Sequence, residues 1–238
     1  MIEKAWIIYK RELASHLLAP LSYVLGAIFL LASGYRFSIM LLETNRVDFY
    51  PILFRYMTNV LLIFIPLLTM GLLAGERERG SIALLFTSPV DEWSVVLGKW
   101  AAIYTVILAY LAMTLPLPAM LFSLAEPDQG PILAGYLGMI LLSSSFCAIG
   151  ILASALSNSS MVAAVLAFGI SLGLALVERL REITGDSLGP FFEGLSYIPP
   201  CRDLFSGVIY VKDLLFFLSL TFFFLFATQR MLCSNRWR

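Results

Sequence analysis

The apolar residues of this chain gather in six long runs, which alternate with shorter segments rich in charged residues, proline and glycine. A helix of about 17 to 25 apolar residues spans the hydrocarbon core of a bilayer, and all six runs reach that length. The pattern therefore predicts an all-α membrane protein with six transmembrane helices in a single domain, residues 1–238. We expect the spans at residues 17–40, 56–74, 94–122, 132–156, 161–177 and 214–230.

The segment before the first run, residues 1–16, is amphipathic rather than apolar. Trp6 and Tyr9 share helical spacing with other apolar residues, beside Lys10 and Arg11. Aromatic and basic side chains of this kind favour the headgroup level of a membrane. We expect an N-terminal interfacial helix here, with His16 as a polar residue at its boundary rather than a ligand or a base.

Prolines indicate where some of the predicted spans bend or end. Pro66 interrupts the second run, and Pro116 with Pro118 should kink or end the third run near the outer face of the membrane. Proline lacks the N–H that an inner helical position donates, and its ring clashes with the preceding turn. The third span is therefore not expected to be one straight helix.

The longest polar stretch, residues 178–213, lies between the fifth and sixth runs and mixes charged with aromatic residues. Its Gly189-Pro190 and Pro199-Pro200 pairs are breaking signals. We expect two short helices at the outer surface, separated by these pairs, with Asp213 as the N-cap of the last span.

Composition supports a membrane protein and narrows the chemistry. The chain is 60% hydrophobic and 13% charged, with a mean hydropathy of +0.87. Sixteen basic and sixteen acidic residues balance, so nothing points to nucleic acid as a partner. One histidine and three scattered cysteines are too few for a zinc or iron-sulfur site, and we expect no metal or cofactor in this chain.

One charged, turn-rich segment in the first half of the chain, residues 75–93, stands between the second and third spans. Ser81 suits a helix N-cap, and Pro89 should end the short amphipathic helix that follows it. That helix is too short to cross a bilayer, so it should lie on the membrane surface or against a soluble partner. On pattern alone, an ordinary solvated loop explains the charges equally well.

The same segment resembles a pattern found in permeases of ABC type-2 transporters, whose ATPase is a separate subunit. The matching residues are Glu76, Glu78, Gly80, Ser81, Ile82, Leu84, Leu85, Thr87, Ser88, Pro89, Gly98 and Lys99. In that family the segment is the cytoplasmic coupling helix that docks on the ATPase. The resemblance implies coupling residues at Glu76, Arg77, Glu78, Gly80, Ser81, Leu84, Leu85, Ser88 and Pro89.

A second match is similar to the gliding-motility-type branch of that family: residues 205–209 (Phe-Ser-Gly-Val-Ile), followed by Asp213 and an apolar run. The resemblance implies a multi-pass protein of the bacterial inner membrane, paired with a second permease copy or a paralogue. It also implies that ATP and Mg are bound by the ATPase partner. An extracytoplasmic accessory protein is a further partner to consider.

Small residues within the spans suggest where two permease subunits would pack. Gly169 to Gly173 reads as the G-x-S-x-G of serine hydrolases, but a nucleophile elbow needs a strand-to-helix turn and a later histidine, and neither is expected here. The spacing fits close helix packing instead. We expect dimer contacts at Gly169 and Gly173 of span five, and at Gly26 and Ala27 of span one.

The distribution of basic residues favours both termini in the cytoplasm. With that topology, nine Lys and Arg lie inside and seven outside, the inner ones being residues 4, 10, 11, 77, 79, 99, 230, 236 and 238. Positive residues favour the cytoplasmic side of membrane proteins. Residues 75–93 then face the cytoplasm and residues 178–213 face outward.

Several functional classes remain to be weighed. The chain contains no G-x-x-x-x-G-K-[ST] motif, so it supplies no P-loop. An ion-coupled secondary transporter would usually carry ionisable residues near the midplane, and an enzyme would carry a catalytic cluster at membrane depth. The predicted spans show neither. We therefore expect the permease subunit of an ATP-driven exporter. The first alternative is a mechanotransmitting ABC membrane subunit that acts on an extracytoplasmic partner without passing substrate, and the second, less favoured one is an ion-coupled secondary transporter.

Overall fold

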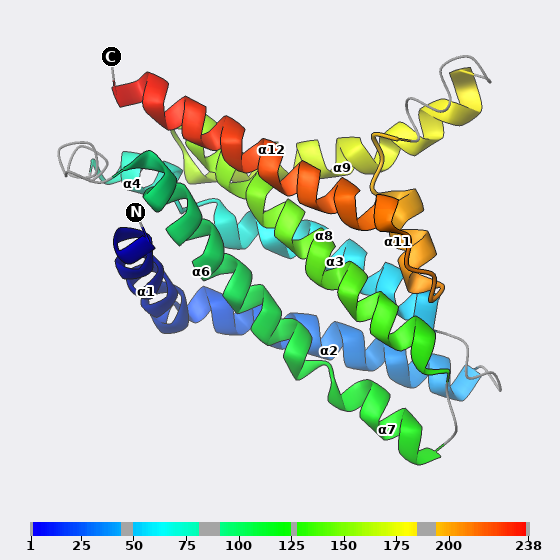
Figure 1. Ribbon diagram of the computed structural model, residues 1–238. Coiled ribbons are helices and arrows are strands. Elements are labelled where there is room, and N and C mark those ends of the chain that lie inside the picture. Colours follow the sequence, from blue (N-terminus) through cyan, green and yellow to red (C-terminus); the bar gives the residue numbers. More distant parts are fainter. Residues whose placement is uncertain (1, 44–49, 81–90, 125–127, 185–193, 237–238) are drawn as a thin grey trace.

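The computed structural model describes residues 2–43, 50–80, 91–124, 128–184 and 194–236, and within these every regular element is a helix (Figure 1). The helices are α1 (Ile2–Leu18), α2 (Pro20–Glu43), α3 (Tyr50–Thr69), α4 (Ala74–Glu78), α6 (Glu92–Met113), α7 (Pro116–Leu124), α8 (Gln129–Leu156), α9 (Ser160–Thr184), α11 (Ile198–Phe205) and α12 (Val211–Arg236).

Six stretches of helix in the described residues are long and apolar enough to cross a membrane, which confirms the predicted fold class. They are Pro20–Leu42, Tyr50–Glu78, Glu92–Phe122, Gln129–Leu156, Ser160–Arg179 and Val211–Ser234. The third stretch contains the predicted break, because α6 ends at Met113 and α7 begins at Pro116. Proline suits this first helical position, where its missing N–H costs nothing.

Helix α8 is the centre of the bundle, in contact with α3, α6, α9, α11 and α12. Its apolar and small side chains are buried along most of its length. A Cβ added at Gly135 would overlap the ring of Phe54, and one added at Gly150 would overlap the side chain of Thr69. These glycines let α3 and α8 approach closely, which is how helices gain contact where lipid offers no hydrophobic difference.

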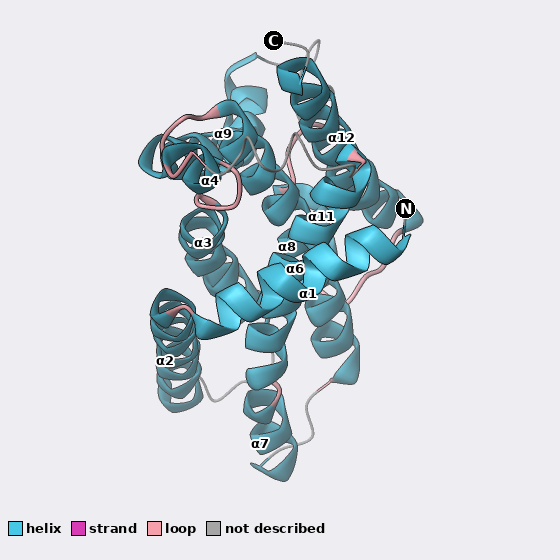
Figure 2. Ribbon diagram, turned by 90° about the vertical axis from the view of Figure 1, so that its left-hand side faces the viewer, coloured by secondary structure: helices cyan, strands magenta, loops and turns pink. Residues whose placement is uncertain are grey.

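The bundle has two ends with different contents. The two termini, α4 and the start of α6 lie at one end, and α7 and α11 lie at the other (Figure 1). We call these the α4 end and the α11 end. Helix α1 lies across the α4 end and packs along α6 (Figure 2). This arrangement suits the predicted interfacial helix, because α1 is turned away from the direction of the spans.

Two spans begin or end further out than the sequence predicted. We expected span two to begin at residue 56, but α3 already begins at Tyr50, because Tyr50, Leu53 and Phe54 are buried against the bundle at helical spacing. Helix α9 continues to Thr184, seven residues past the predicted end of span five. Charged residues at the end of a long helix need not terminate it, since they reach water directly.

Two predictions for residues 178–213 were wrong in detail. Pro199 and Pro200 do not separate helices; they lie in the first turn of α11, where their missing N–H groups would be unbonded in any residue. Asp213 is not an N-cap, because α12 begins two residues earlier, at Val211. Gly189 and Pro190 lie outside the described residues.

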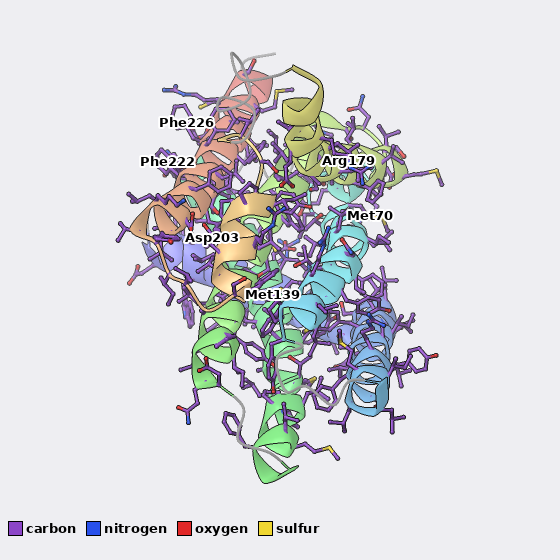
Figure 3. The ribbon with its side chains drawn as sticks, turned by 90° about the vertical axis from the view of Figure 1, so that its right-hand side faces the viewer. Met70, Met139, Arg179, Asp203, Phe222 and Phe226 are labelled. Carbon is purple, nitrogen blue, oxygen red and sulfur yellow. The ribbon has the colours of Figure 1, made fainter. Side chains whose placement is uncertain are left out.

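The outer faces of the bundle are strongly apolar. On α12, Phe222 lies on the outer face with an exposed fraction of 64%, and Phe226 is 38% exposed beside Trp93 of α6 (Figure 3). Helices α2 and α9 expose large apolar side chains in the same way. Such surfaces are expected where lipid or a second membrane subunit, rather than water, covers the protein.

Candidate functional site

The predicted coupling segment begins on α4, which follows α3 after a short turn. Helix α4 carries Glu76, Arg77 and Glu78, and Gly80 is the last residue that the structure describes before residues 81–90. Gly80 has a φ of +71°, in the left-handed region that glycine adopts without a steric penalty. Five of the predicted residues, Ser81, Leu84, Leu85, Ser88 and Pro89, lie outside the described residues.

The turn between α3 and α4 is held by one serine of α8. The hydroxyl of Ser154 accepts hydrogen bonds from the backbone N–H groups of Leu73 and Ala74, both at 3.0 Å, and donates to the carbonyl of Met70 at 2.9 Å. Ser154 is fully buried. These backbone groups would otherwise have no partner at a helix boundary. The start of the coupling segment is therefore anchored to the centre of the bundle.

A buried lysine joins helices α1, α4 and α6. The ammonium of Lys99, on α6, lies 2.8 Å from Oε1 of Glu12 on α1 and 2.9 Å from Oε1 of Glu76 on α4. Only 2% of the Lys99 side chain is exposed, against 14% for Glu12 and 13% for Glu76. A charge buried to this extent is tolerated only when it is paired. We call these three residues the lysine triad.

The neighbour of the lysine, Gly98, explains how α1 comes close enough to take part. A Cβ at Gly98 would lie 2.9 Å from the carbonyl oxygen of Ala5 and 2.9 Å from Cβ of Ile8. The absence of a side chain therefore lets α1 lie directly on α6. Gly98 and Lys99 therefore have two roles at this contact. Gly98 allows α1 to pack closely against α6, and Lys99 binds the carboxylate of Glu12 on α1.

Two further side chains of α4 attach it to the junction of α8 and α9. The carboxylate of Glu78 accepts two hydrogen bonds from Ser160, one from the backbone N–H and one from the hydroxyl, both at 2.8 Å. Ser160 is the first residue of α9, so Glu78 places a negative charge at the positive end of that helix. Arg77 donates to the carbonyl of Ser157 at 3.1 Å.

Histidine 16 lies beside the lysine triad on α1. Burial lowers the pKa of His16, the negative charge of Glu12 opposes that shift, and the positive charge of Lys99 adds to it. Because the ordinary pKa of histidine is about 6.5, a lowered value leaves the ring neutral at pH 7. The side chain is therefore a neutral polar group near the end of α1.

The structure brings together part of the predicted site and adds two residues that were not among the predicted coupling residues. Glu76 and Glu78 are both among the predicted coupling residues. Glu76 meets a lysine of the same chain, and Glu78 meets the start of α9. Glu12 and Lys99 were not predicted as site residues, although a lone lysine next to an apolar run already calls for a nearby carboxylate.

The predicted dimer residues fall into two groups. Gly26 is buried, and a Cβ there would lie 2.7 Å from the ring of Tyr110 in the same chain, so this glycine serves packing within the subunit. Ala27, Gly169 and Gly173 are exposed, and added Cβ atoms at Gly169 and Gly173 would meet nothing within 4 Å. Only the second group offers a surface for another subunit.

The described residues offer no metal site, since no three His, Cys, Asp or Glu side chains among them come together. What the arrangement can do is mechanical. A segment between two spans is fixed at its start to α1, α6, α8 and α9 through the lysine triad, Ser154 and Glu78. A movement of α4 would be transmitted to these helices through short hydrogen bonds and ion pairs.

Six helices that are long and apolar enough to span a membrane define a multi-pass membrane protein, in which hydrogen bonds and ion pairs hold the polar segment after the second span. The chain belongs to the family described as ABC-2 family transporter protein, whose sequence profile matches residues 6–232. It is also similar to the probable multidrug ABC transporter permease YbhR of Escherichia coli, strains K12 and O157:H7, with 25% identity over 142 residues. The match covers 59% of this chain and 38% of each relative, so the chain spans well under half of their length.

Proposed function

We propose that the chain is the membrane permease subunit of an ABC exporter, driven by a separate ATPase subunit that binds ATP and Mg. The observation that carries the proposal is the bracing of α4. A docking segment must pass force to the spans, and α4 is tied to four other helices by buried or charge-assisted contacts. Family membership and the similarity to a probable multidrug ABC permease support the same conclusion.

In the proposed mechanism, residues 81–90 dock on the ATPase and follow its nucleotide-driven closure. A displacement of α4 would move α1 and α6 through the lysine triad, and α9 through Glu78 and Ser160. Nucleotide can shift the permease between states only if the contacts of this segment differ between them. Rigid movement of packed helices is one of the known ways in which such a shift is carried.

A mechanotransmitting subunit is the second candidate. At the α11 end, Arg202 of α11 donates a hydrogen bond to Glu178 of α9 at 2.8 Å, so the last part of α9 and α11 are joined outside the bundle core. Such a platform would suit an extracytoplasmic partner. The gliding-motility-type branch, suggested by residues 205–209 and Asp213, is likewise part of this proposal.

The proposal is tested by reconstituting the purified permease with candidate ABC ATPase subunits in liposomes. We expect one of them to bind and to change its rate of ATP turnover when the permease is present. If the cognate ATPase hydrolyses ATP at the same rate with and without the permease, and does not co-purify with it, the assignment as a coupled permease is wrong.

We predict that the α4 end faces the cytoplasm and the α11 end faces outward. In a Cys233→Ser background, Leu84→Cys should resist a membrane-impermeant thiol reagent added outside intact cells, whereas Asp128→Cys should react. The two other cysteines, Cys147 and Cys201, are buried, so they give little background. Labelling at residue 84 and protection at residue 128 would reverse the topology.

We also predict that two permease subunits meet along the exposed face of α9. Gly173→Leu adds a bulky side chain to a surface where close backbone approach drives association, and it should reduce the dimer fraction about tenfold. The matched control is Ser219→Leu, on an exposed position of α12. Dimer fractions can be measured by single-molecule subunit counting in bilayers, and an unchanged fraction for Gly173→Leu would place the interface elsewhere.

A further inference from the structure

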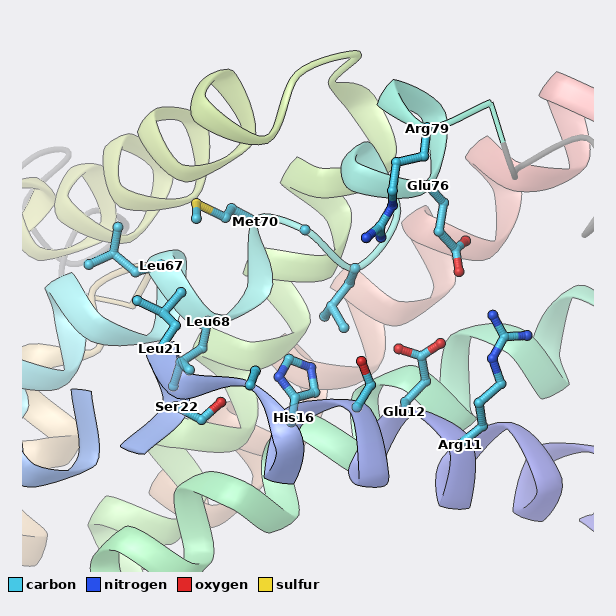
Figure 4. Close-up of a pocket in the computed structure, with 14 residues that line it drawn as sticks. Arg11, Glu12, His16, Leu21, Ser22, Leu67, Leu68, Met70, Glu76 and Arg79 are labelled. Atoms are coloured by element: carbon cyan, nitrogen blue, oxygen red, sulfur yellow. The ribbon is translucent and has the colours of Figure 1, made fainter. Parts of the chain in front are cut away.

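A cavity of about 590 Å³ lies beside the lysine triad, between α1, the turn into α2, the end of α3, and α4 (Figure 4). Its volume is within the usual range for sites that bind small molecules. Nothing in the proposed coupling mechanism uses this space.

The two ends of the cavity differ in chemistry. Arg11, Glu12 and His16 rise from α1 toward α3 and α4, and Arg79 reaches down from α4 into the same space (Figure 4). At the other end the lining is apolar and comes from α2 and α3, with Leu21, Leu67 and Leu68 grouped together. A ligand for this cavity would therefore carry a charged group and an apolar chain.

At the polar end, three cations (Arg11, Arg79 and the adjacent Lys99) outnumber two carboxylates. Glu12 and Glu76 both line the cavity, but they share the ammonium of Lys99. Neither Arg11 nor Arg79 forms an ion pair with another described residue, and the hydrogen bond that Arg79 makes uses only Nε, which donates to the carbonyl of Gly75 at 3.0 Å. The two guanidinium groups thus have donors available for an anion.

We propose that this cavity binds the phosphate headgroup of an anionic phospholipid, with Arg11 and Arg79 on the phosphate and the leucines of α2 and α3 around the start of an acyl chain. Guanidinium groups bind phosphate oxygens in pairs of parallel hydrogen bonds. The position also fits, because the turn between α1 and α2 joins the predicted interfacial helix to the first span, at the depth where headgroups lie.

A lipid in this position would bridge α1 and α4 directly beside the lysine triad. The cavity would then be a second link between the same two helices, supplied by the membrane rather than by the chain. The inference concerns binding by the permease alone and does not depend on an ATPase partner.

The test is native mass spectrometry of the purified permease, titrated with phosphatidylglycerol or with phosphatidylcholine of the same acyl chains. We expect phosphatidylglycerol to bind at least about tenfold more tightly, because each basic residue near an anionic lipid raises the affinity about fivefold. The double variant Arg11→Gln/Arg79→Gln should remove that preference. The double variant Lys10→Gln/Arg230→Gln removes the same charge from positions at the same end that do not line the cavity, and it should bind like wild type.

A charge-retaining variant, Arg11→Lys/Arg79→Lys, checks that the loss does not come from misfolding, and it should keep most of the preference. Equal binding of the two lipids by wild type, or unchanged binding by Arg11→Gln/Arg79→Gln, would overturn the proposal. A third arm adds inorganic phosphate or glycerol phosphate at millimolar concentration. Displacement of the lipid by either would make the ligand a soluble anion and would also overturn the assignment to lipid.

Discussion

Lys99→Met is expected to destabilise the folded protein by about 3 kcal/mol or more and to lower its thermal unfolding midpoint by several degrees. The change removes the ammonium that lies 2.8 Å from Glu12 and 2.9 Å from Glu76. The two carboxylates, which are only 14% and 13% exposed, would then lose the cation that they share. Breaking a buried ion pair by removing one partner costs far more than the pair contributes, because a charge stays behind.

Two matched variants make this prediction specific. Lys212→Met removes a lysine whose side chain is 70% exposed and lies 3.6 Å from Asp203, a surface pair worth about 1 kcal/mol or less. The triple variant Glu12→Gln/Glu76→Gln/Lys99→Met removes all three charges together and should recover most of the stability. If Lys99→Met unfolds at the same temperature as Lys212→Met, the lysine triad does not hold α1, α4 and α6 together.

Glu78→Lys and Gly80→Val are expected to abolish the effect of the permease on ATP turnover while leaving membrane insertion and dimerisation intact. Glu78→Lys exchanges the two hydrogen bonds to Ser160 for a cation at the positive end of α9. Gly80→Val forces a β-branched residue into a backbone with φ of +71°, which costs roughly 1–2 kcal/mol and shifts the turn that leads into the docking segment. Both positions are exposed, so the fold should tolerate them.

The measurement is ATP turnover by the cognate ATPase in liposomes that contain each variant. Gly80→Asn is the control for the backbone, because asparagine adopts the left-handed conformation more readily than other side chains, and it should keep much of the stimulation. Glu3→Lys makes the same charge reversal at an exposed position of α1 and should behave like wild type. Wild-type stimulation by both Glu78→Lys and Gly80→Val would remove the coupling role from this segment.

The fold class could be predicted from the sequence because the length and apolar character of a span are properties of one continuous segment. The ends of the spans could not, because they depend on packing. Tyr50 starts α3 early by burial against the bundle, and Pro199 and Pro200 read as a break although they begin a helix. Proline is equally suited to both roles, so its position in the helix decides which one applies.

The sequence predicted only some of the residues of the candidate site. Glu76 and Glu78 were found through a contiguous motif, whereas Glu12 belongs to the site only because Gly98 lets α1 lie on α6. Gly26 was predicted as a contact between subunits, but it packs within one subunit. A small residue in a span suits either kind of contact. Which of the two applies depends on Tyr110, which lies 84 positions further along the chain.

Docking of the chain between α4 and α6 on a separate ATPase is tested most directly by placing a photoreactive amino acid at residue 84 and irradiating the permease together with its ATPase in membranes. Leu195, which is 43% exposed and stands close to α11 in the sequence, is the matched position for the other end of the bundle. We predict a covalent adduct with the ATPase from residue 84 and none from residue 195. An adduct from residue 195, or none from residue 84 while the complex stays intact, would contradict the account.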